Sequence, residues 1–327
     1  MTERSEGMPA ARGGVARPAP PARQLAALVG ADVVRDLGAK ADGPGARRAA
    51  AHLALLVGGA AAVWEARGTR WIVPALVVHG CVLAHAFAAL HETSHRTAFS
   101  RRRANDVGGA VAGALVWLSP TYFRHEHRAH HSTTGDPVSD PERIPAPGSW
   151  MSYVAFLVGG AYWHWNVSTT VGHAAGRFAD WEGFVPDHAR SQVVRESRWL
   201  VGGLATLVAV SVVTGSTALW WLWALPRLIG EPWMRAARLA EHTGLAPTGA
   251  ITGSTRSLRV PRPLRWLAWE MPFHAEHHAA PSVPFHALAR LHRHLGPYLM
   301  VPVAGPLVAH RAAVGAGRRA AVVAPDP

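Results

Sequence analysis

Long apolar blocks alternate with polar segments between residues 49 and 229 of this chain. The first two blocks cover residues 49–64 and 71–90, and the second contains no aspartate, glutamate, lysine or arginine. A helix of about 20 residues spans the roughly 30 Å hydrocarbon layer of a bilayer. We therefore expect a transmembrane helical hairpin, closed by a short turn at residues 65–70.

Four further apolar blocks follow this hairpin. The block at residues 107–118 is too short to span a bilayer, so we expect a re-entrant or interfacial helix there. The blocks at 199–213 and 217–229 flank a short turn and are expected to cross as a second hairpin, with residues 150–170 at the interface. The alternative, in which residues 150–170 cross, stays open. Both versions predict an all-α integral membrane protein with about four transmembrane helices.

The two ends of the chain lack such blocks. Residues 1–48 are rich in Ala, Pro, Gly and Arg, which predicts a mostly disordered basic arm, with a short helix near residues 25–37. Residues 309–327 are expected to form a loose tail. The remaining residues, 49–308, are expected to form a single membrane domain.

Composition and charge agree with a membrane location. Hydrophobic residues make up 49% of the 327 residues and charged residues 17%, whereas soluble domains carry about 25% charged residues. The net charge of +12 is compatible with a nucleic-acid partner. Together with apolar blocks, however, it favours cytoplasmic loops that face anionic lipid, and we expect no nucleic-acid partner.

Arginines indicate the orientation of the first hairpin. Arg47 and Arg48 precede it, and Arg96 and residues 101–103 follow it, which places both of its ends in the cytoplasm by the positive-inside rule. Lys40 is the only lysine, which together with the Ala and Gly content suggests a high-GC bacterium. We therefore expect a bacterial inner-membrane protein with a histidine-rich cytoplasmic cap. The single cysteine excludes an intramolecular disulfide and a cysteine-based zinc site.

The histidines are the strongest chemical signal. The chain has 20 of them, and eight fall into three clusters whose i, i+3 and i+4 spacings place imidazoles on one helical face. Isolated histidines are expected to be ordinary polar residues: His52, His79, His188 and His310. Three same-face groupings instead predict metal binding by His91, His95, His127, His130, His131, His274, His277 and His278.

The number of clustered histidines indicates the kind of metal site. A zinc ion takes three or four protein ligands, so eight histidines are too many for one zinc. Two metal ions are expected, and an all-histidine di-iron centre that activates dioxygen is the chemistry that fits. An even number of crossings between the second and third clusters would bring all three to one side of the membrane.

The three clusters resemble the histidine boxes of the membrane fatty-acid desaturase and hydroxylase family. Residues 91–95 look like the first box, and residues 123–131, followed by Asp140-Pro-Glu142, look like the second. Trp269-Glu-Met-Pro-Phe-His-Ala-Glu-His-His278 looks like the third and is the most specific. The resemblance covers residues 71–299, so that residues 49–308 are expected to be a desaturase-like domain.

The resemblance implies further ligands and partners. In Arg238-Leu-Ala-Glu-His242, the histidine resembles a ninth ligand of the family. The family implies two non-haem iron ions, O2 as a co-substrate and a lipid or acyl substrate, with no catalytic side chain beyond the metal centre. Desaturation is expected, with hydroxylation or ketolation of a lipid-like substrate as the alternative. We expect no fused cytochrome b5 module, which implies a separate electron donor such as a ferredoxin.

Other residues are expected around the metal and the substrate. Trp117, Trp266, Trp269 and Ala279 are expected to line the substrate channel, and the small Ala279 and Ala280 to widen it where the family often has bulky apolar residues. Glu270 stands where the family often has an amide. Carboxylates beside the ligands are expected to orient the imidazoles: Glu92, Glu126, Glu241, Glu276 and Asp140, with Glu142 in a similar position.

Two hypotheses from other functional classes compete with the desaturase interpretation. His91-Glu92-Thr-Ser-His95 matches the H-E-x-x-H motif of zinc proteases, with Glu92 as the general base, but an intramembrane protease would leave the other clusters without a role. A metal-binding or transport protein would need polar groups deep within its spans. Most histidines lie outside them, with His79 and His85 as exceptions.

Overall fold

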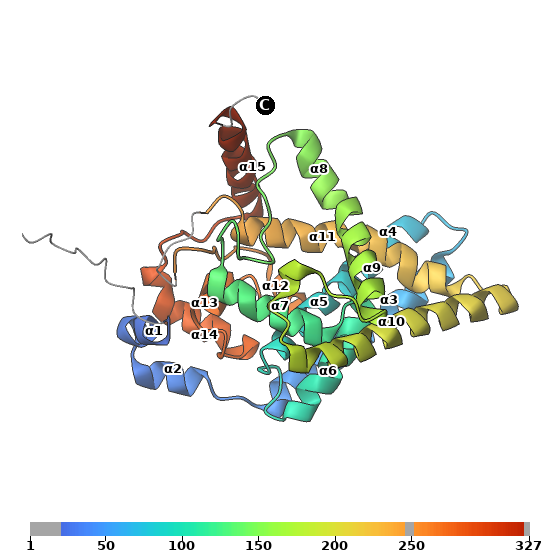
Figure 1. Cartoon of the computed structure of the whole chain (residues 1–327), viewed down its shortest axis with the longest axis horizontal. Coiled ribbons are helices and arrows are strands. Elements are labelled where there is room, and N and C mark those ends of the chain that lie inside the picture. The colour runs from blue at the N-terminus through green and yellow to red at the C-terminus, as the bar shows by residue number, and fades with distance from the viewer. Residues whose placement is uncertain (1–20, 246–251, 324–327) are drawn as a thin grey trace, which may run out of the picture.

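A computed structural model describes residues 21–245 and 252–323 (Figure 1). Within these ranges the regular secondary structure is helical, apart from one isolated β-bridge between Leu258 and Ala304. The all-α prediction is therefore confirmed. The first seven helices are α1 Pro21–Val29, α2 Ala31–Leu37, α3 Asp42–Ala66, α4 Ile72–Ala84, α5 Ala86–Ser94, α6 Arg102–Val116 and α7 Pro120–Thr133.

The second half of the chain contains the longest helix and most of the short ones. The α-helices are α8 Trp150–Val158, α9 Gly160–Ala174, α10 Asp187–Thr214, α11 Leu225–His242, α12 Arg262–Leu267, α13 His274–Ala279, α14 Phe285–Leu295 and α15 Pro306–Val323. Short 3-10 or π segments are η1 Asp180–Glu182, η2 Trp220–Ala224 and η3 Gly296–Tyr298.

Three helical segments of the described chain are long and apolar enough to cross a membrane. They are α3, the run Ile72–Ser94 that joins α4 and α5, and α10. The fourth expected crossing, at residues 217–229, consists of η2 and the start of α11. This return segment carries the buried ion pair of Arg227 and Glu231, with 2.6 Å between Nη1 and Oε2, so it is less apolar than the other three. We expected about four transmembrane helices, and three segments of the described chain meet the criteria of length and composition.

Two other apolar blocks form short helices. Residues 150–170 are divided at Gly159, whose φ of +78° ends α8 in the left-handed conformation before α9 begins. The block at residues 107–118 lies mainly in α6, which has 15 residues. Each of these helices falls short of the roughly 20 residues that a crossing needs. Their expected place at the membrane interface stays a prediction.

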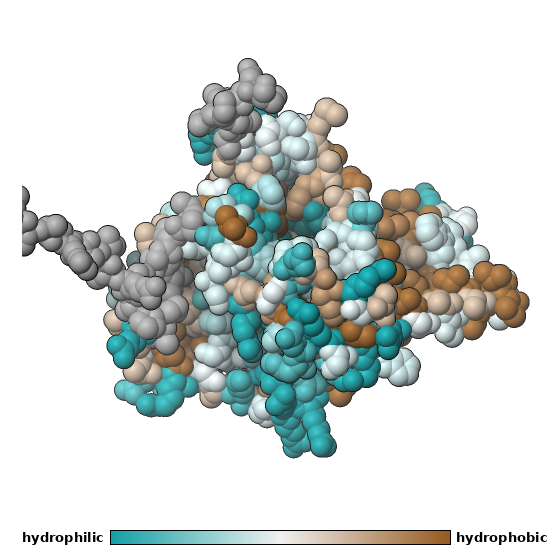
Figure 2. All heavy atoms as spheres, viewed as in Figure 1, coloured by the Kyte–Doolittle hydropathy of each residue, from teal (hydrophilic) through white to brown (hydrophobic). Residues whose placement is uncertain are grey.

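The surface is divided between an apolar end and a polar cap. Figure 2 shows apolar surface gathered at the end of the molecule where α10 turns back toward α11 in Figure 1. Leu207, Val212 and Val213 of α10 are among the exposed side chains there. Such a large exposed apolar surface is costly in water and is typical of contact with lipid. We therefore treat α3, the run of α4 and α5, and α10 as the membrane-spanning part.

The N-terminal arm differs from the expected mostly disordered segment. From Pro21 onward it is helical, and α1 and α2 cover the short helix expected near residues 25–37. Leu25 and Leu37 are buried in a core cluster that also holds Trp269 and Leu288. Apolar side chains at helical spacing thus fix this segment to the cap. The high Ala and Pro content led us to expect disorder instead. Residues 1–20 lie outside the described residues.

The expected loose tail is also largely helical. Helix α15 begins at Pro306, and its Ala309 packs in a small cluster with Ala240 of α11 and with Leu258. Alanine has the highest helix propensity, and its small side chain permits close packing, so a segment without a long apolar block still docks. Residues 324–327 lie outside the described residues. The proposed domain boundaries stay a prediction.

Replacing Gly230 with alanine is expected to destabilise the contact between α4 and α11. The new Cβ would collide with the carbonyl oxygen of Gly80, and a Cβ on Gly80 would lie 2.6 Å from the carbonyl oxygen of Pro226. Because both obstacles are backbone atoms, the helices must move apart, at a cost of about 1–3 kcal/mol. The unfolding temperature of the purified protein should fall.

Gly202→Ala on α10 is the matched control. A Cβ there has no atom within 4 Å, so this variant should keep the unfolding temperature of the original chain or raise it slightly. Equal unfolding temperatures for the two variants would contradict the tight contact between α4 and α11.

Candidate metal centre

Four helical segments bring the histidine clusters together in the cap. The first cluster ends α5, the second lies on α7, and the third forms most of α13 (Figure 1). Helix α7 starts at a well-capped N-terminus, where Ser119 Oγ accepts a hydrogen bond from Tyr122 N and Pro120 occupies the first turn. His242 is the last residue of α11.

Five imidazoles form the first of two neighbouring groups. His131 Nε2 lies 3.0 Å from His127 Nε2 and 3.0 Å from His277 Nε2. The ligand atoms of the whole group lie within 4.8 Å of one another. Such a convergence from three helices is the arrangement that a metal ion requires. The members of this group are His91, His95, His127, His131 and His277.

The remaining four histidines form the second group. His130, His242 and His278 offer ligand atoms within 4.8 Å of one another, and His274 joins them through His242. The Nε2 atoms of His274 and His242 are 2.7 Å apart. All nine histidines expected as ligands therefore lie in two adjacent groups. The four isolated histidines, including His52, are outside both.

The chemistry of these imidazoles fits metal binding. Burial lowers the pKa of His95 and of His274 to about 3, so both rings are neutral and keep a free lone pair. Several buried ring nitrogens have no hydrogen-bond partner in the described part of the chain. Unsatisfied buried polar atoms are rare in proteins and need an explanation, such as an unseen ion. They include Nε2 of His91, His95, His130 and His278.

Two carboxylates hold ligand histidines from behind. Asp140 Oδ1 accepts a hydrogen bond from His130 Nδ1 at 2.7 Å, and Glu142 Oε1 accepts one from His127 Nδ1 at 2.7 Å. Each bond leaves Nε2 of the same ring free to face a metal. Arg238 Nη2 donates to Glu142 Oε2 at 2.8 Å and so fixes this carboxylate in turn.

Three of the expected orienting carboxylates point elsewhere. Glu92 Oε1 accepts a hydrogen bond from Phe285 N at 3.0 Å, Glu276 bonds Ser257 and His292, and Glu126 is buried beside Tyr122. Each directly neighbours a ligand on a helix, and successive helical residues are rotated by about 100°, so these side chains face away from the metal groups. Asp140 and Glu142 instead follow α7 and reach its ligands from the side.

Glu241 takes an intermediate position. Its Oε2 lies 3.9 Å from His274 Nδ1, and it belongs with His242 and His274 to a third possible ligand set. Burial raises the pKa of Glu241 to about 8. Its place in this set, rather than its pKa, makes it a candidate ligand as well as an orienting residue, a role that its position beside His242 did not suggest.

The geometry does not support a zinc protease. His91 and His95 share their group with three other histidines, so they do not form a separate two-histidine site. The Glu92 carboxylate, which would have to hold the attacking water, binds the backbone of Phe285 instead.

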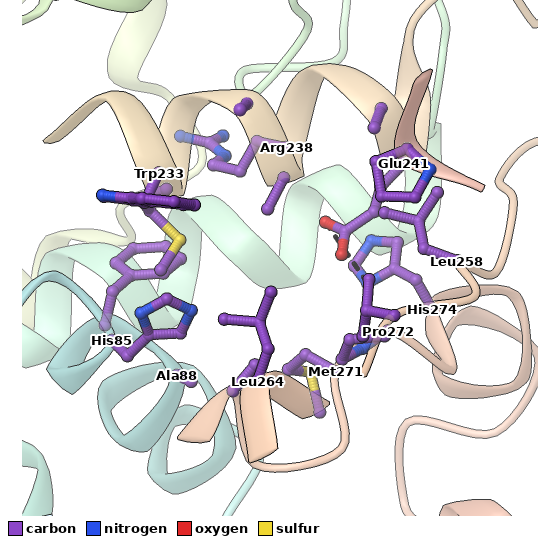
Figure 3. Close-up of a pocket in the computed structure, with 18 of the residues that line it drawn as sticks. His85, Ala88, Trp233, Arg238, Glu241, Leu258, Leu264, Met271, Pro272 and His274 are labelled. Atoms are coloured by element: carbon purple, nitrogen blue, oxygen red, sulfur yellow. Dashed lines mark ion pairs between the residues drawn. The ribbon is translucent and has the colours of Figure 1, made fainter. Parts of the chain in front are cut away.

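An apolar cavity of about 340 Å³ reaches the metal groups (Figure 3). His91, His127, His242 and His274 form part of its wall. His85, side chains from α5, α11 and α15, and side chains from residues 258–272 complete it. The apolar lining includes Ala88, Trp233, Met234, Leu258, Leu264 and Met271.

The residues expected to form the channel do not line this cavity. Trp269 and Ala279 are buried in the core cluster that holds Leu25, and Trp266 lies beneath the guanidinium of Arg48. Trp117 Nε1 donates to the carbonyl oxygen of Leu200 at 3.2 Å. Nearness in sequence to a ligand does not determine the direction of a side chain. The apolar face of α11, with Trp233 and Met234, was the signal that sequence reasoning missed.

Comparisons with known proteins agree with this arrangement. The sequence profile of the fatty acid desaturase family matches residues 68–305, well over half of the chain. A fatty acid desaturase of Bacillus subtilis (strain 168) is 20% identical over 251 residues, which cover 69% of this chain and 68% of the relative. The chain therefore belongs to the fatty acid desaturase family and is an oxidoreductase of the desaturase type.

Proposed function

We propose that this protein is a di-iron enzyme that uses O2 and an external electron donor to desaturate the acyl chain of a lipid. The observation that carries the proposal is the convergence of nine buried or partly buried histidines into two adjacent groups beside an apolar cavity. Two groups favour two metal ions, and imidazole suits iron as well as zinc or copper. Membership of the desaturase family favours iron among these metals.

The residues of the chain have distinct tasks in this proposal. The nine histidines would hold the iron ions, and Asp140 and Glu142 would fix the rings of His130 and His127. Bound iron would activate O2, the oxidant for removing hydrogen from an unactivated methylene group. The apolar wall of the cavity would position that methylene and exclude water, which limits side reactions.

Desaturation and hydroxylation share this machinery. The names of the Bacillus subtilis relative and of the family favour desaturation. Hydroxylation or ketolation of a lipid-like substrate is the alternative, because the outcome depends on where the substrate carbon lies relative to the metal.

Metal analysis and lipid analysis together test the proposal. The protein is produced in a bacterial host, purified in detergent and assayed for iron, zinc and copper per chain, and the host lipids are analysed by mass spectrometry. We expect about two iron ions per chain and acyl chains lighter by two hydrogens. Acyl chains heavier by one oxygen would instead identify a hydroxylase. A chain that binds no iron even after reconstitution would contradict the proposal.

We further propose that an acidic electron donor, such as a ferredoxin, docks on the cap. Arg96, Arg102 and Arg124 surround the single carboxylate of Asp106, at N···O distances of 3.9, 3.9 and 3.2 Å. This leaves the group with net positive charge, and Arg128 is exposed nearby on α7 between two ligand histidines. His95 and His131 are only partly buried, so this face offers a short path to the metal.

Reversing the charge of Arg128 and Arg102 to glutamate should slow reduction by a ferredoxin about tenfold or more at low ionic strength, because electrostatic steering raises association rates by 10- to 1000-fold. The difference should shrink at high salt. Stopped-flow reduction of the iron-loaded protein measures the rate. The same change at Arg190, which pairs with Asp187 on α10, is the control. A salt-independent rate would contradict docking by charge.

The location remains part of the proposal. The apolar end and the candidate spans favour a membrane protein. We propose a bacterial inner membrane with the cap in the cytoplasm, supported by the arginines that flank α3 and the run of α4 and α5.

A further inference from the structure

One buried histidine points into the apolar cavity from the side opposite the metal groups. Figure 3 shows the ring of His85 facing the cavity across from His274 and Glu241. His85 lies between α4 and α5 and is only 4% exposed. Its neighbours in the wall are mostly apolar, including Ala88, Trp233 and Leu264.

The hydrogen bonding of His85 determines which atom faces the cavity as an acceptor. His85 Nδ1 lies 2.7 Å from the carbonyl oxygen of Cys81. A carbonyl oxygen only accepts, so Nδ1 must carry the hydrogen. A charged imidazole in an apolar wall would be costly without an acidic partner. The ring is therefore neutral, with a lone pair on Nε2.

His52, a buried histidine of the neighbouring helix α3, shows the contrast. Its Nε2 lies 3.0 Å from the carbonyl oxygen of Val82, and its Nδ1 accepts a hydrogen bond from Trp269 Nε1 at 3.4 Å. Both nitrogens of His52 are thus satisfied by the protein, as in an ordinary structural histidine. In the described part of the chain, His85 Nε2 has no such protein partner and faces the cavity, so that its lone pair is open to whatever occupies the cavity.

We propose that the cavity selects an aliphatic chain that carries a hydroxyl group, which donates a hydrogen bond to His85 Nε2. This inference rests on the proposed function in taking the cavity as the substrate site. A plain hydrocarbon chain would cover the lone pair and leave it unpaired, whereas a hydroxyl would satisfy it. His85 is then a specificity-determining residue, and the substrate is a hydroxylated lipid chain rather than an ordinary acyl chain.

Binding of 1-dodecanol and dodecane to the purified protein tests the inference without turnover. The rise in unfolding temperature is measured over a concentration series of each probe. One neutral hydrogen bond corresponds to an affinity difference of about threefold to tenfold. We expect 1-dodecanol to bind that much more tightly than dodecane to the original chain. The preference should vanish in His85→Phe and persist in His85→Gln, whose side-chain carbonyl still accepts.

Met234→Leu is the matched control, because it alters the same wall without a polar atom and should leave the preference unchanged. If His85→Phe does not fold, the smaller His85→Leu replaces it. Equal affinities of the two probes for the original chain, as expected if His85 binds only water, would overturn the inference. So would a preference that survives the loss of the imidazole. Neither result depends on iron or on catalysis, so a failure of the proposed function would be seen separately, in the metal and lipid assays.

Discussion

The variant His277→Ala is expected to lose bound iron and, with it, oxidation of the lipid substrate. His277 is 1% exposed, and its ring centroid lies 4.6 to 4.8 Å from those of His91, His95 and His131. Removing a central ligand should therefore disrupt the whole first group. Mutation of a residue that only supports a ligand typically lowers metal affinity or activity 10- to 100-fold. Loss of a ligand itself should therefore lower iron affinity at least about 100-fold.

Iron content per chain and lipid products measure this effect together. His127→Ala, which removes a second member of the same group, should behave in the same way. His188→Ala is the control, since His188 is exposed on α10 and lies outside both groups. A single zinc ion that survives in both ligand variants but is lost in His95→Ala would contradict the di-iron proposal and revive the protease.

The variant Asp140→Asn is expected to weaken iron binding about 10- to 100-fold while the chain stays folded. Asp140 Oδ1 accepts from His130 Nδ1 at 2.7 Å, and Oδ2 accepts from Gly135 N at 2.8 Å. Asparagine has the same shape but offers only one acceptor oxygen and no charge. His130 would lose the partner that fixes its ring, or the loop after α7 would lose its anchor.

Titration of iron into the metal-free protein gives the affinities, and the unfolding temperature checks the fold. Asp136→Asn is the matched control: Asp136 lies in the same loop and is partly exposed, and its carboxylate caps only Val138 and Ser139. If both variants bind iron as tightly as the original chain, the bond between Asp140 and His130 has no part in holding the metal.

The sequence predicts the convergence of the candidate metal-binding side chains better than it predicts their surroundings. Spacings of three and four residues place His91 and His95 on one helical face whatever the tertiary structure, so local geometry alone makes the clusters visible. The hairpin of residues 49–64 and 71–90 is similarly visible, since lipid requires long apolar helices. Both depend on the backbone of one element and not on how elements pack.

The directions of the side chains that neighbour the histidines depend on how the helices pack. Spacing along the sequence could not predict these directions. Glu92 follows His91 in the chain, yet it faces the start of α14, because the helix turns the two side chains apart. Trp269 is close in sequence to His274 but supports the core beneath α1. The sequence identifies His85 only as one of two histidines within the apolar blocks. Its place in the wall of the cavity becomes visible only in the folded structure.

The origin of the ligands also has a consequence for how the protein is made in the cell. Each candidate metal group takes histidines from α7 and from α13, so neither group can be complete until the ribosome has made the chain as far as α13. A bound metal would then close a very long loop, as a disulfide would in a secreted protein, and the lone Cys81 cannot supply such a link. Iron supply would therefore set how many newly made chains close their cap, and how many stay open to membrane proteases.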